Sequence, residues 1–304
     1  MVTVGPNALE RFPRFSLYNS PYAAHDEGCA VDLYPHEGDW RKTGDDGESR
    51  ATRAPSPVAG EVTLTRTVSA PSKPYAVDHD HLIVVDTGEH LARILHVDPG
   101  VEPGETVAVG DSLGEMVRSG FFAPWVDNHL HLGFRERDAD PVRASGSLPV
   151  AVAPDDGLVG VAWDGTGTVV ARGDTYAVLD APDHPAPGER FAGIASGGER
   201  DRILDGGLPH YDGGGVLGDA VGDDADRVPV SLAGRRAGVA DGRTVAWDDL
   251  TVLANGTPIT GLSLFVAREA LGAKLVCPEV EFAVGEAVSV RLEPADAADC
   301  SKHH

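Results

Sequence analysis

The chain has 304 residues, long enough for two domains with separate cores, and 41% of its residues are hydrophobic, as in ordinary globular proteins. It carries 48 acidic and 25 basic residues, a formal net charge of −23, which argues against binding to nucleic acid, because that needs a basic surface. No apolar run reaches the ~18 residues of a membrane span, and three widely spaced cysteines imply no disulfide framework.

The acidic residues are spread along the whole chain and lysine is scarce, a composition typical of proteins adapted to high salt. In multimolar salt the Debye length falls to roughly 3 Å or less, so repulsion between like charges is largely screened. The first residues also lack the basic and apolar segments of a signal peptide. We therefore expect a cytoplasmic protein from a high-salt organism.

The first half of the chain is predicted to be a β domain, since no convincing helical periodicity appears between residues 55 and 135. An irregular lead-in with three prolines occupies residues 1–24, and a polar loop rich in glycine and aspartate occupies residues 36–54. Strands are expected near 57–67, at 81–86 and at 91–97, where His96 would share a face with Ile94 and Ala92.

A glycine-spaced run follows these strands. Valine, glycine and leucine recur every three residues from Val101 to Leu113, and Gly114 ends the run. Short strands broken by glycine turns at this spacing are typical of compact β-sandwich hybrids. The N-terminal domain is therefore predicted to be a β-sandwich or barrel-sandwich hybrid.

The composition changes after Arg143, and we place a domain boundary there, giving residues 1–145 and 146–304. The second domain is predicted to be β-rich, an accessory domain of unknown role, with a long loop region or ordered insertions at 183–226 and room for one short helix within 262–275. Its expected strands lie within 157–165, 167–174, 175–182, 228–234, 244–253, 262–267 and 287–294.

Residues 129–134 read His-Leu-His-Leu-Gly-Phe, an alternation that predicts a strand. The leucines and Phe134 would enter the core, whereas His129 and His131 would lie on the opposite face, about 6.6–6.8 Å apart along the strand. One imidazole could bind a metal while the other acts on whatever the metal activates. The alternative is a partly exposed strand with two ordinary histidines.

Five short sequence segments occur in a fixed order along the first half of the chain. They are a His…Asp pair (His25 and Asp32, the latter within VDLYP), the proline-bounded strand entry PSPVAGEV, the strand histidine of RILHVDPG, the run VEPGETVAVGDSLG, and HLHLGF. In this order they resemble the lysostaphin-type, LytM-like zinc metallopeptidase family, whose fold is a duplicated hybrid motif. The resemblance covers about residues 25–135 and does not reach the second domain.

By position, the resemblance implies that His25, Asp32 and His131 bind Zn²⁺ and that His96 and His129 are the catalytic pair. Two imidazoles and one carboxylate leave a fourth tetrahedral position open, as in catalytic zinc sites. His129 suits the general base, and His96 suits oxyanion stabilisation or protonation of the leaving group. Six residues separate His25 from Asp32 where the family has three, so Cys29, at the family's spacing, is an alternative ligand, and a remodelled or lost site is another alternative.

The resemblance implies a zinc-dependent hydrolase that cleaves a peptide bond, with a peptide or peptide-crosslinked polymer as substrate. The alternative is a non-catalytic relative that acts as a binding or regulatory module. A biotinyl or lipoyl carrier is excluded, because it needs a lysine at a hairpin tip and none lies between Lys73 and Lys274. The segment His79-Asp80-His81 is a competing metal cluster, and the three glycines at 213–215 open no phosphate-binding helix.

Overall fold

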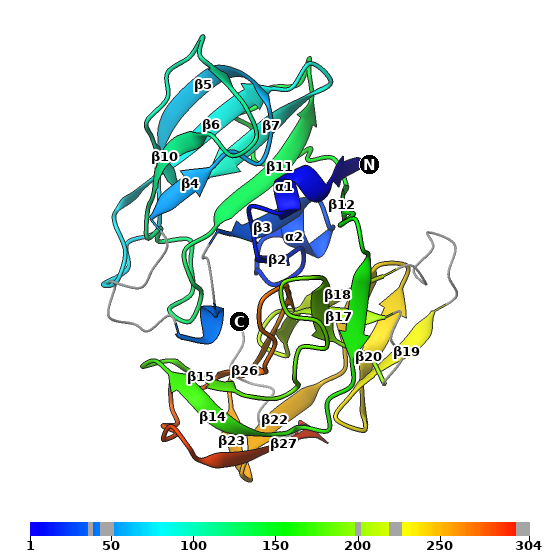
Figure 1. Ribbon diagram of the computed structural model, residues 1–304. Helices are drawn as coiled ribbons and strands as arrows, with labels where there is room; N and C mark the ends of the chain where they lie inside the picture. Colours follow the sequence, from blue (N-terminus) through cyan, green and yellow to red (C-terminus); the bar gives the residue numbers. More distant parts are fainter. Residues whose placement is uncertain (36–38, 43–51, 198–201, 219–226, 296–304) are drawn as a thin grey trace. The chain divides into compact units, whose positions relative to one another are not determined.

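The computed structural model describes residues 1–35, 39–42, 52–197, 202–218 and 227–295 (Figure 1). They form two compact units, one comprising Met1–Leu17 and Tyr22–Gly157, the other comprising Tyr18–Pro21 and the chain from Leu158 onward. The division after Gly157 lies later in the chain than residue 145, where composition placed the boundary. Four residues of the lead-in also join the second unit.

The first unit is mainly β, with a few single-turn helices. The lead-in expected to be irregular contains regular elements, so that expectation was wrong. The elements of this unit are β1 (Val2–Val4), α1 (Pro6–Leu9), β2 (Arg14–Ser16), α2 (Ala23–Asp26), β3 (Ala30–Tyr34), the 3-10 helix η1 (Trp40–Lys42), β4 (Arg53–Pro55), β5 (Gly60–Ser69), β6 (His79–Asp86), β7 (His90–Leu95), β8 (Val97–Pro99), β9 (Thr106–Val107), β10 (Ser112–Met116), β11 (Leu130–Glu136) and β12 (Val150–Val152).

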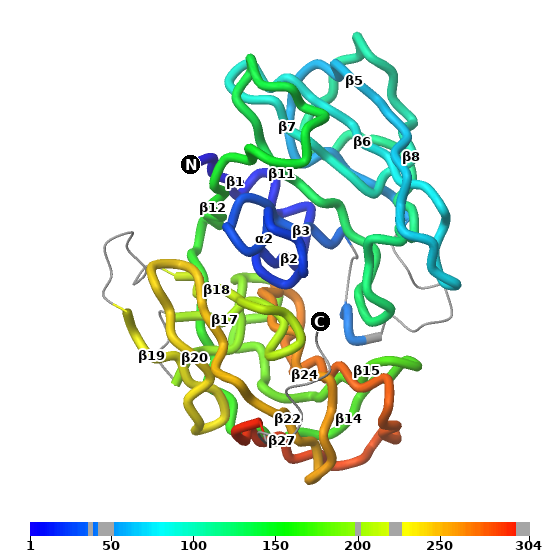
Figure 2. The backbone as a smooth tube through the Cα atoms, turned by 180° about the vertical axis from the view of Figure 1, so that it is seen from behind, coloured from blue at the N-terminus to red at the C-terminus, as the bar shows by residue number. Residues whose placement is uncertain are grey.

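The main sheet of this unit has the strand order β2-β3-β11-β7-β6-β5-β9, with every neighbouring pair antiparallel. Figure 2 shows β5, β6 and β7 side by side from behind. A smaller sheet has the order β4-β10-β8, and the glycine-spaced run ends in its central strand, β10. The strand β11 therefore lies between β3 and β7, so side chains from three strands can meet on one face of the sheet.

The alternation predicted for β11 is present. Leu130, Leu132 and Phe134 are buried, whereas His131 between them is partly exposed. His129 directly precedes the strand. Hydrophobic burial on one face thus fixes which face carries the histidine.

The strand expected at 91–97 is interrupted. β7 ends at Leu95 and β8 begins at Val97, because His96 has a φ of 72°, in the left-handed region. The expectation that His96 shares a strand face with Ile94 and Ala92 was therefore wrong. A left-handed residue does not continue the side-chain alternation of a strand.

The regular elements in the described part of the second unit are all strands. These strands are β13 (Leu158–Val161), β14 (Thr166–Arg172), β15 (Tyr176–Leu179), β16 (Phe191–Ile194), β17 (Ile203–Leu208), β18 (Gly213–Leu217), β19 (Val228–Leu232), β20 (Arg235–Asp241), β21 (Thr244–Trp247), β22 (Leu250–Ala254), β23 (Thr257–Ile259), β24 (Gly261–Leu264), β25 (Val266–Ala267), β26 (Lys274–Val276) and β27 (Ala287–Pro294).

Twelve of these strands form one antiparallel sheet in the order β19-β20-β21-β18-β17-β24-β26-β15-β14-β27-β22-β23. Val230 of β19 and Val252 of β22 belong to the same buried apolar cluster although their strands lie toward opposite ends of this order. The sheet therefore curves around a single core. The mainly β fold predicted for the chain, with two β-rich domains, is confirmed.

The short helix allowed for within residues 262–275 does not form, because β24, β25 and the start of β26 occupy this segment. Of the two alternatives for 183–226, the long loop is wrong and ordered structure is present, since the described part contains β16, β17 and β18. Glycine is needed in β18 because a Cβ on Gly214 would lie 2.2 Å from the Trp247 ring. The glycines that suggested a loop thus make room for packed aromatic rings.

Candidate metal centre

His25 lies on α2, a single helical turn that a glycine ends. The amide of Gly28, whose φ is 62°, donates to the carbonyl of His25, and the amide of Cys29 donates to the carbonyl of Ala24. This pair of bonds is a Schellman motif, which closes the helix and turns the chain. The six residues between His25 and Asp32 therefore complete a helix, a stop and the entry into β3.

Asp32 and His131 are brought together by strand pairing. In the antiparallel pair of β3 and β11, Asp32 is the direct partner of His131. Directly opposed residues of antiparallel strands have side chains on the same face, with Cβ atoms about 4.5–5.5 Å apart. Register thus places a carboxylate beside an imidazole although 99 residues separate them in the sequence.

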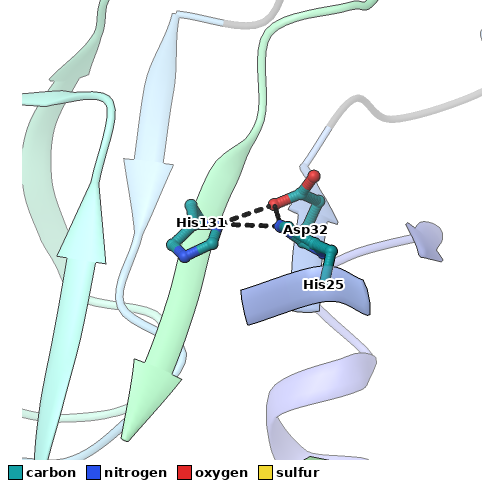
Figure 3. A group of neighbouring side chains, drawn as sticks. All are labelled: His25, Asp32 and His131. Carbon is teal, nitrogen blue, oxygen red and sulfur yellow. Dashed lines mark hydrogen bonds and ion pairs between the residues drawn. The ribbon is translucent and has the colours of Figure 1, made fainter. Parts of the chain in front are cut away.

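The three side chains converge on one another (Figure 3). His25 Nε2 lies 3.0 Å from His131 Nδ1, and Asp32 Oδ1 lies 3.3 Å from the former and 3.1 Å from the latter. Within the described residues, they are the one group of histidine, cysteine and acidic side chains with the spacing of a metal site. Cys29, the alternative ligand, is buried but is not a member of this group.

The hydrogen bonds of His25 and His129 commit one nitrogen of each ring. The Nδ1 of His25 donates to the carbonyl oxygen of Leu17 over 2.6 Å, and the Nδ1 of His129 donates to that of Asp127 over 3.0 Å. A carbonyl oxygen only accepts, so Nδ1 carries the hydrogen and each Nε2 of the neutral rings carries a lone pair. Metal-binding histidines commonly donate their other N–H in this way.

Asp32 is nearly fully buried, and its surroundings set the charge of the group. Burial raises the pKa of its carboxyl, but the surrounding imidazoles of His129, His25 and His131 outweigh burial and hold that pKa well below its usual range. Burial lowers the pKa of His129 to about 3 and that of His131 to about 4. At neutral pH the group therefore combines the Asp32 carboxylate with the neutral imidazoles of His129 and His131.

The histidine nitrogens around Asp32 bring lone pairs close to its carboxylate oxygens. The Nε2 of His129 lies 3.3 Å from Asp32 Oδ2, and the Nε2 of His25 lies 3.3 Å from Asp32 Oδ1. Both nitrogens present lone pairs to a carboxylate, because their hydrogens are held by Leu17 and Asp127. A cation among them removes this repulsion, since it is bound by lone pairs.

The donor set and spacing fit zinc. Ligand atoms about 2.0–2.2 Å from a tetrahedral zinc ion lie about 3.3–3.6 Å apart, close to the three separations between His25, Asp32 and His131. Two imidazoles and one carboxylate also leave the fourth position open, as in catalytic sites. These three residues could therefore hold the ion that the sequence predicted.

His96 and His129, the predicted catalytic pair, lie beside the group. The His96 ring centroid is 5.3 Å from that of His129 and 6.0 Å from that of His131. Both are buried, and Phe122 contacts both, with ring centroids 4.6 Å from His96 and 4.3 Å from His129. The aromatic ring restricts water around the two imidazoles, as a proton-transfer site requires.

The sequence did not indicate the groups that orient these histidines. The carbonyls of Leu17 and Asp127 are backbone atoms with no signature of their own, and no sequence pattern singled out Phe122. In the competing cluster, His79 and His81 lie on β6 with ring centroids 5.3 Å apart, and Asp98 Oδ1 lies 3.6 Å from His81 Nε2. Within the described residues, these side chains do not form a group with the spacing of a metal site.

Fold and site together define a two-domain, mainly β protein with a buried His-His-Asp cluster in its N-terminal unit. Residues 3–152 match a family model described as "Domain of unknown function (DUF8155) N-terminal domain", and residues 159–293 match one described as the DUF8155 C-terminal domain. The chain is thus built of the two DUF8155 domains. Within the described residues, no helix is long and apolar enough to cross a membrane.

The chain matches no curated protein sequence. Among solved structures it is similar to LytU, with 19% identity and a TM-score of 0.26 over 39% of this chain and 68% of that chain. It is also similar to the catalytic domain of the antimicrobial peptidase lysostaphin from Staphylococcus simulans, with 16% identity and a TM-score of 0.28 over 44% of this chain and 86% of that chain. Because both scores are low, the case for a metal centre rests on the side-chain geometry.

Proposed function

We propose that the N-terminal unit is a zinc-dependent hydrolase that cleaves a peptide bond, with a peptide or peptide-crosslinked polymer as substrate. One observation carries the proposal. Three imidazole nitrogens surround the buried carboxylate of Asp32, and those of His25 and His129 present lone pairs to it. Such a cluster is suited to binding a cation. His96 and His129, which are not assigned as ligands, are suited to moving protons beside it.

His25, Asp32 and His131 would hold the ion. When bound, zinc polarises a carbonyl as a Lewis acid and lowers the pKa of water to about 7. The Nε2 of His129 accepts a proton from the attacking water, because its Nδ1 is committed to the Asp127 carbonyl. His96, which lies between β7 and β8, donates from Nε2 when its ring is doubly protonated, giving a proton to the leaving amine or a hydrogen bond to the oxyanion.

The first test is metal content by mass spectrometry on the tag-free protein. Wild type should contain about one zinc per chain and His131→Ala should lose it, because the variant retains only two of three ligands. His90→Ala is the matched control, since His90 starts β7 in the same unit and is not one of the clustered residues. A wild type that binds no zinc after reconstitution contradicts the proposal.

Cleavage of a peptide library then separates the two candidate functions. Zinc-loaded wild type that cleaves peptides supports the hydrolase. Zinc binding without any cleavage favours the second candidate, a non-catalytic binding or regulatory module. The buried state of His25, Asp32 and His129 is the observation that keeps this second candidate in view, because a substrate must reach the group through the partly exposed side of His131.

A further inference from the structure

Asp80, the central residue of the His79-Asp80-His81 segment, is buried outside the group of candidate metal ligands. Its side chain is 0% exposed, at the start of β6, in the same unit as the metal centre. It is not part of the cluster formed by His25, Asp32 and His131. A buried carboxylate needs partners that compensate the loss of water, and its partners reveal its role.

The Asp80 carboxylate accepts four hydrogen bonds. Its Oδ1 accepts from the backbone amides of His81 and His96 over 2.7 and 3.0 Å, and its Oδ2 accepts from Nδ1 of His96 and Oγ of Ser119 over 2.5 and 2.6 Å. An ionised carboxylate has about four lone-pair positions, and all are used here. Asp80 therefore has no capacity left for a metal ion.

Two of the four bonds come from a single residue, His96. One holds its backbone amide and the other holds its ring. The backbone at His96 has a φ of 72°, a conformation that is unfavourable for a non-glycine residue and persists where surrounding contacts hold it. Asp80 thus secures both the unusual backbone and the side chain of His96.

The ring bond also fixes the tautomer. Asp80 stays ionised, because His96 and its other donors hold the pKa of this carboxyl at about 2 in spite of burial. An ionised carboxylate only accepts, so Nδ1 of His96 carries the hydrogen and Nε2 is the nitrogen left for proton transfer. His129 has the same tautomer, but its Nδ1 partner is a neutral carbonyl.

We propose that Asp80 is the positioning residue of His96, which holds the backbone of this histidine and fixes the tautomer whose Nε2 is free to act at the metal centre. The effect on catalysis rests on the proposed hydrolase function, whereas the tautomer does not. Ser119 supports Asp80 by donating to the same oxygen that His96 uses.

The test variant is Asp80→Asn, which keeps the size of the side chain. The two backbone amides can only donate, so they retain the amide oxygen of the new side chain, and its NH₂ group then points at Nδ1 of His96 and at Ser119. The hydroxyl of Ser119 can turn to accept. His96 must accept at Nδ1, and its hydrogen moves to Nε2.

We would measure the His96 tautomer by ¹⁵N NMR on the full chain at neutral pH, with His96→Gln for assignment. Wild type should show Nδ1–H and Asp80→Asn should show Nε2–H, with zinc content unchanged. Asp98→Asn is the matched control, since Asp98 lies two residues beyond His96 and its side chain is 65% exposed. The proposal is overturned if wild-type His96 carries Nε2–H, if Asp80→Asn keeps Nδ1–H, or if Asp98→Asn also inverts the tautomer.

Activity is the second readout. If wild type cleaves a peptide, Asp80→Asn should lower kcat by on the order of 10²–10⁴ and leave KM within a few-fold. The uncharged amide cannot accept a hydrogen bond from Nδ1 while Nε2 donates, nor compensate the positive charge of a doubly protonated ring, so proton transfer is impaired but binding is not. An equal loss through KM alone contradicts positioning. If wild type cleaves nothing, the proposed function fails, and the tautomers alone decide the role of Asp80. Should Asp80→Asn not fold, the wild-type tautomer still decides it.

Discussion

The two units are both antiparallel β structures, but they use their interiors differently. In the first, buried ionisable side chains gather around one place, where Asp32 and Asp80 each hold two or more imidazole or amide groups. In the second, a large apolar cluster draws on most of the sheet, and the buried charged side chains Asp205 and Lys274 do not form a group with the spacing of a metal site within the described residues. Buried charge costs stability unless it is paired, whereas apolar burial adds stability. We therefore assign the proposed chemistry to the first unit, where the candidate metal ligands lie.

The largest expected effect is the loss of peptide cleavage when the His129 side chain is removed from the first unit. His129→Ala should retain zinc, because His25, Asp32 and His131 remain, yet cleavage should fall by about 10²–10⁴-fold through loss of a general base. Parallel assays of metal content and peptide cleavage measure both. Loss of zinc in this variant shows that His129 is a ligand instead, and undiminished cleavage shows that it is not the base.

A cavity in the apolar cluster of the second unit tests the other half of the comparison. Leu275 is fully buried within the apolar cluster, and Leu275→Ala should lower the free energy of unfolding by about 2–5 kcal/mol through lost contacts and a cavity. Denaturant titration measures this, and zinc content of the folded protein should match wild type. Val284→Ala is the control, since Val284 is 64% exposed and should change stability by less than about 0.5 kcal/mol. A loss of zinc in folded Leu275→Ala contradicts this assignment of the chemistry to the first unit.

Asp80 makes the first unit sensitive to acid. Its pKa is about 2 in the folded protein against an ordinary value of 3.8, so it stabilises the fold above pH 3.8 and this contribution disappears as the pH falls toward 2. The shift corresponds to about 2 kcal/mol. Unfolding measured between pH 2 and 5 should therefore depend less steeply on pH in Asp80→Asn than in wild type. Identical pH profiles rule out this linkage.

Salt should produce the smallest change. The net charge of −23 creates repulsion within the folded chain, and raising KCl from 0.1 to 1 M shortens the Debye length from about 10 to about 3 Å. We expect a modest rise in Tm over this range. A fall in Tm contradicts both this estimate of repulsion and the expected adaptation to high salt.

The resemblance of five sequence segments to the lysostaphin-type family implied the three residues that the structure brings together, because the segments around Asp32 and His131 are local patterns that can be recognised in order along the chain. Two other features could not be predicted in this way. The left-handed backbone at His96 has no glycine to announce it, and it is held by Asp80, sixteen positions away. The glycines of β18 indicated a loop, because nothing local shows that Trp247 packs where a Cβ would lie.

The pairing of β3 with β11 has one further consequence. Asp32 meets His131 in a single register, and a slip of one residue would turn Asp32 to the opposite face of the sheet. A misregistered molecule could bury similar apolar surface and yet assemble no ligand cluster. Metal binding would then favour the correct fold, because only molecules with correctly paired strands could bind the ion and be active.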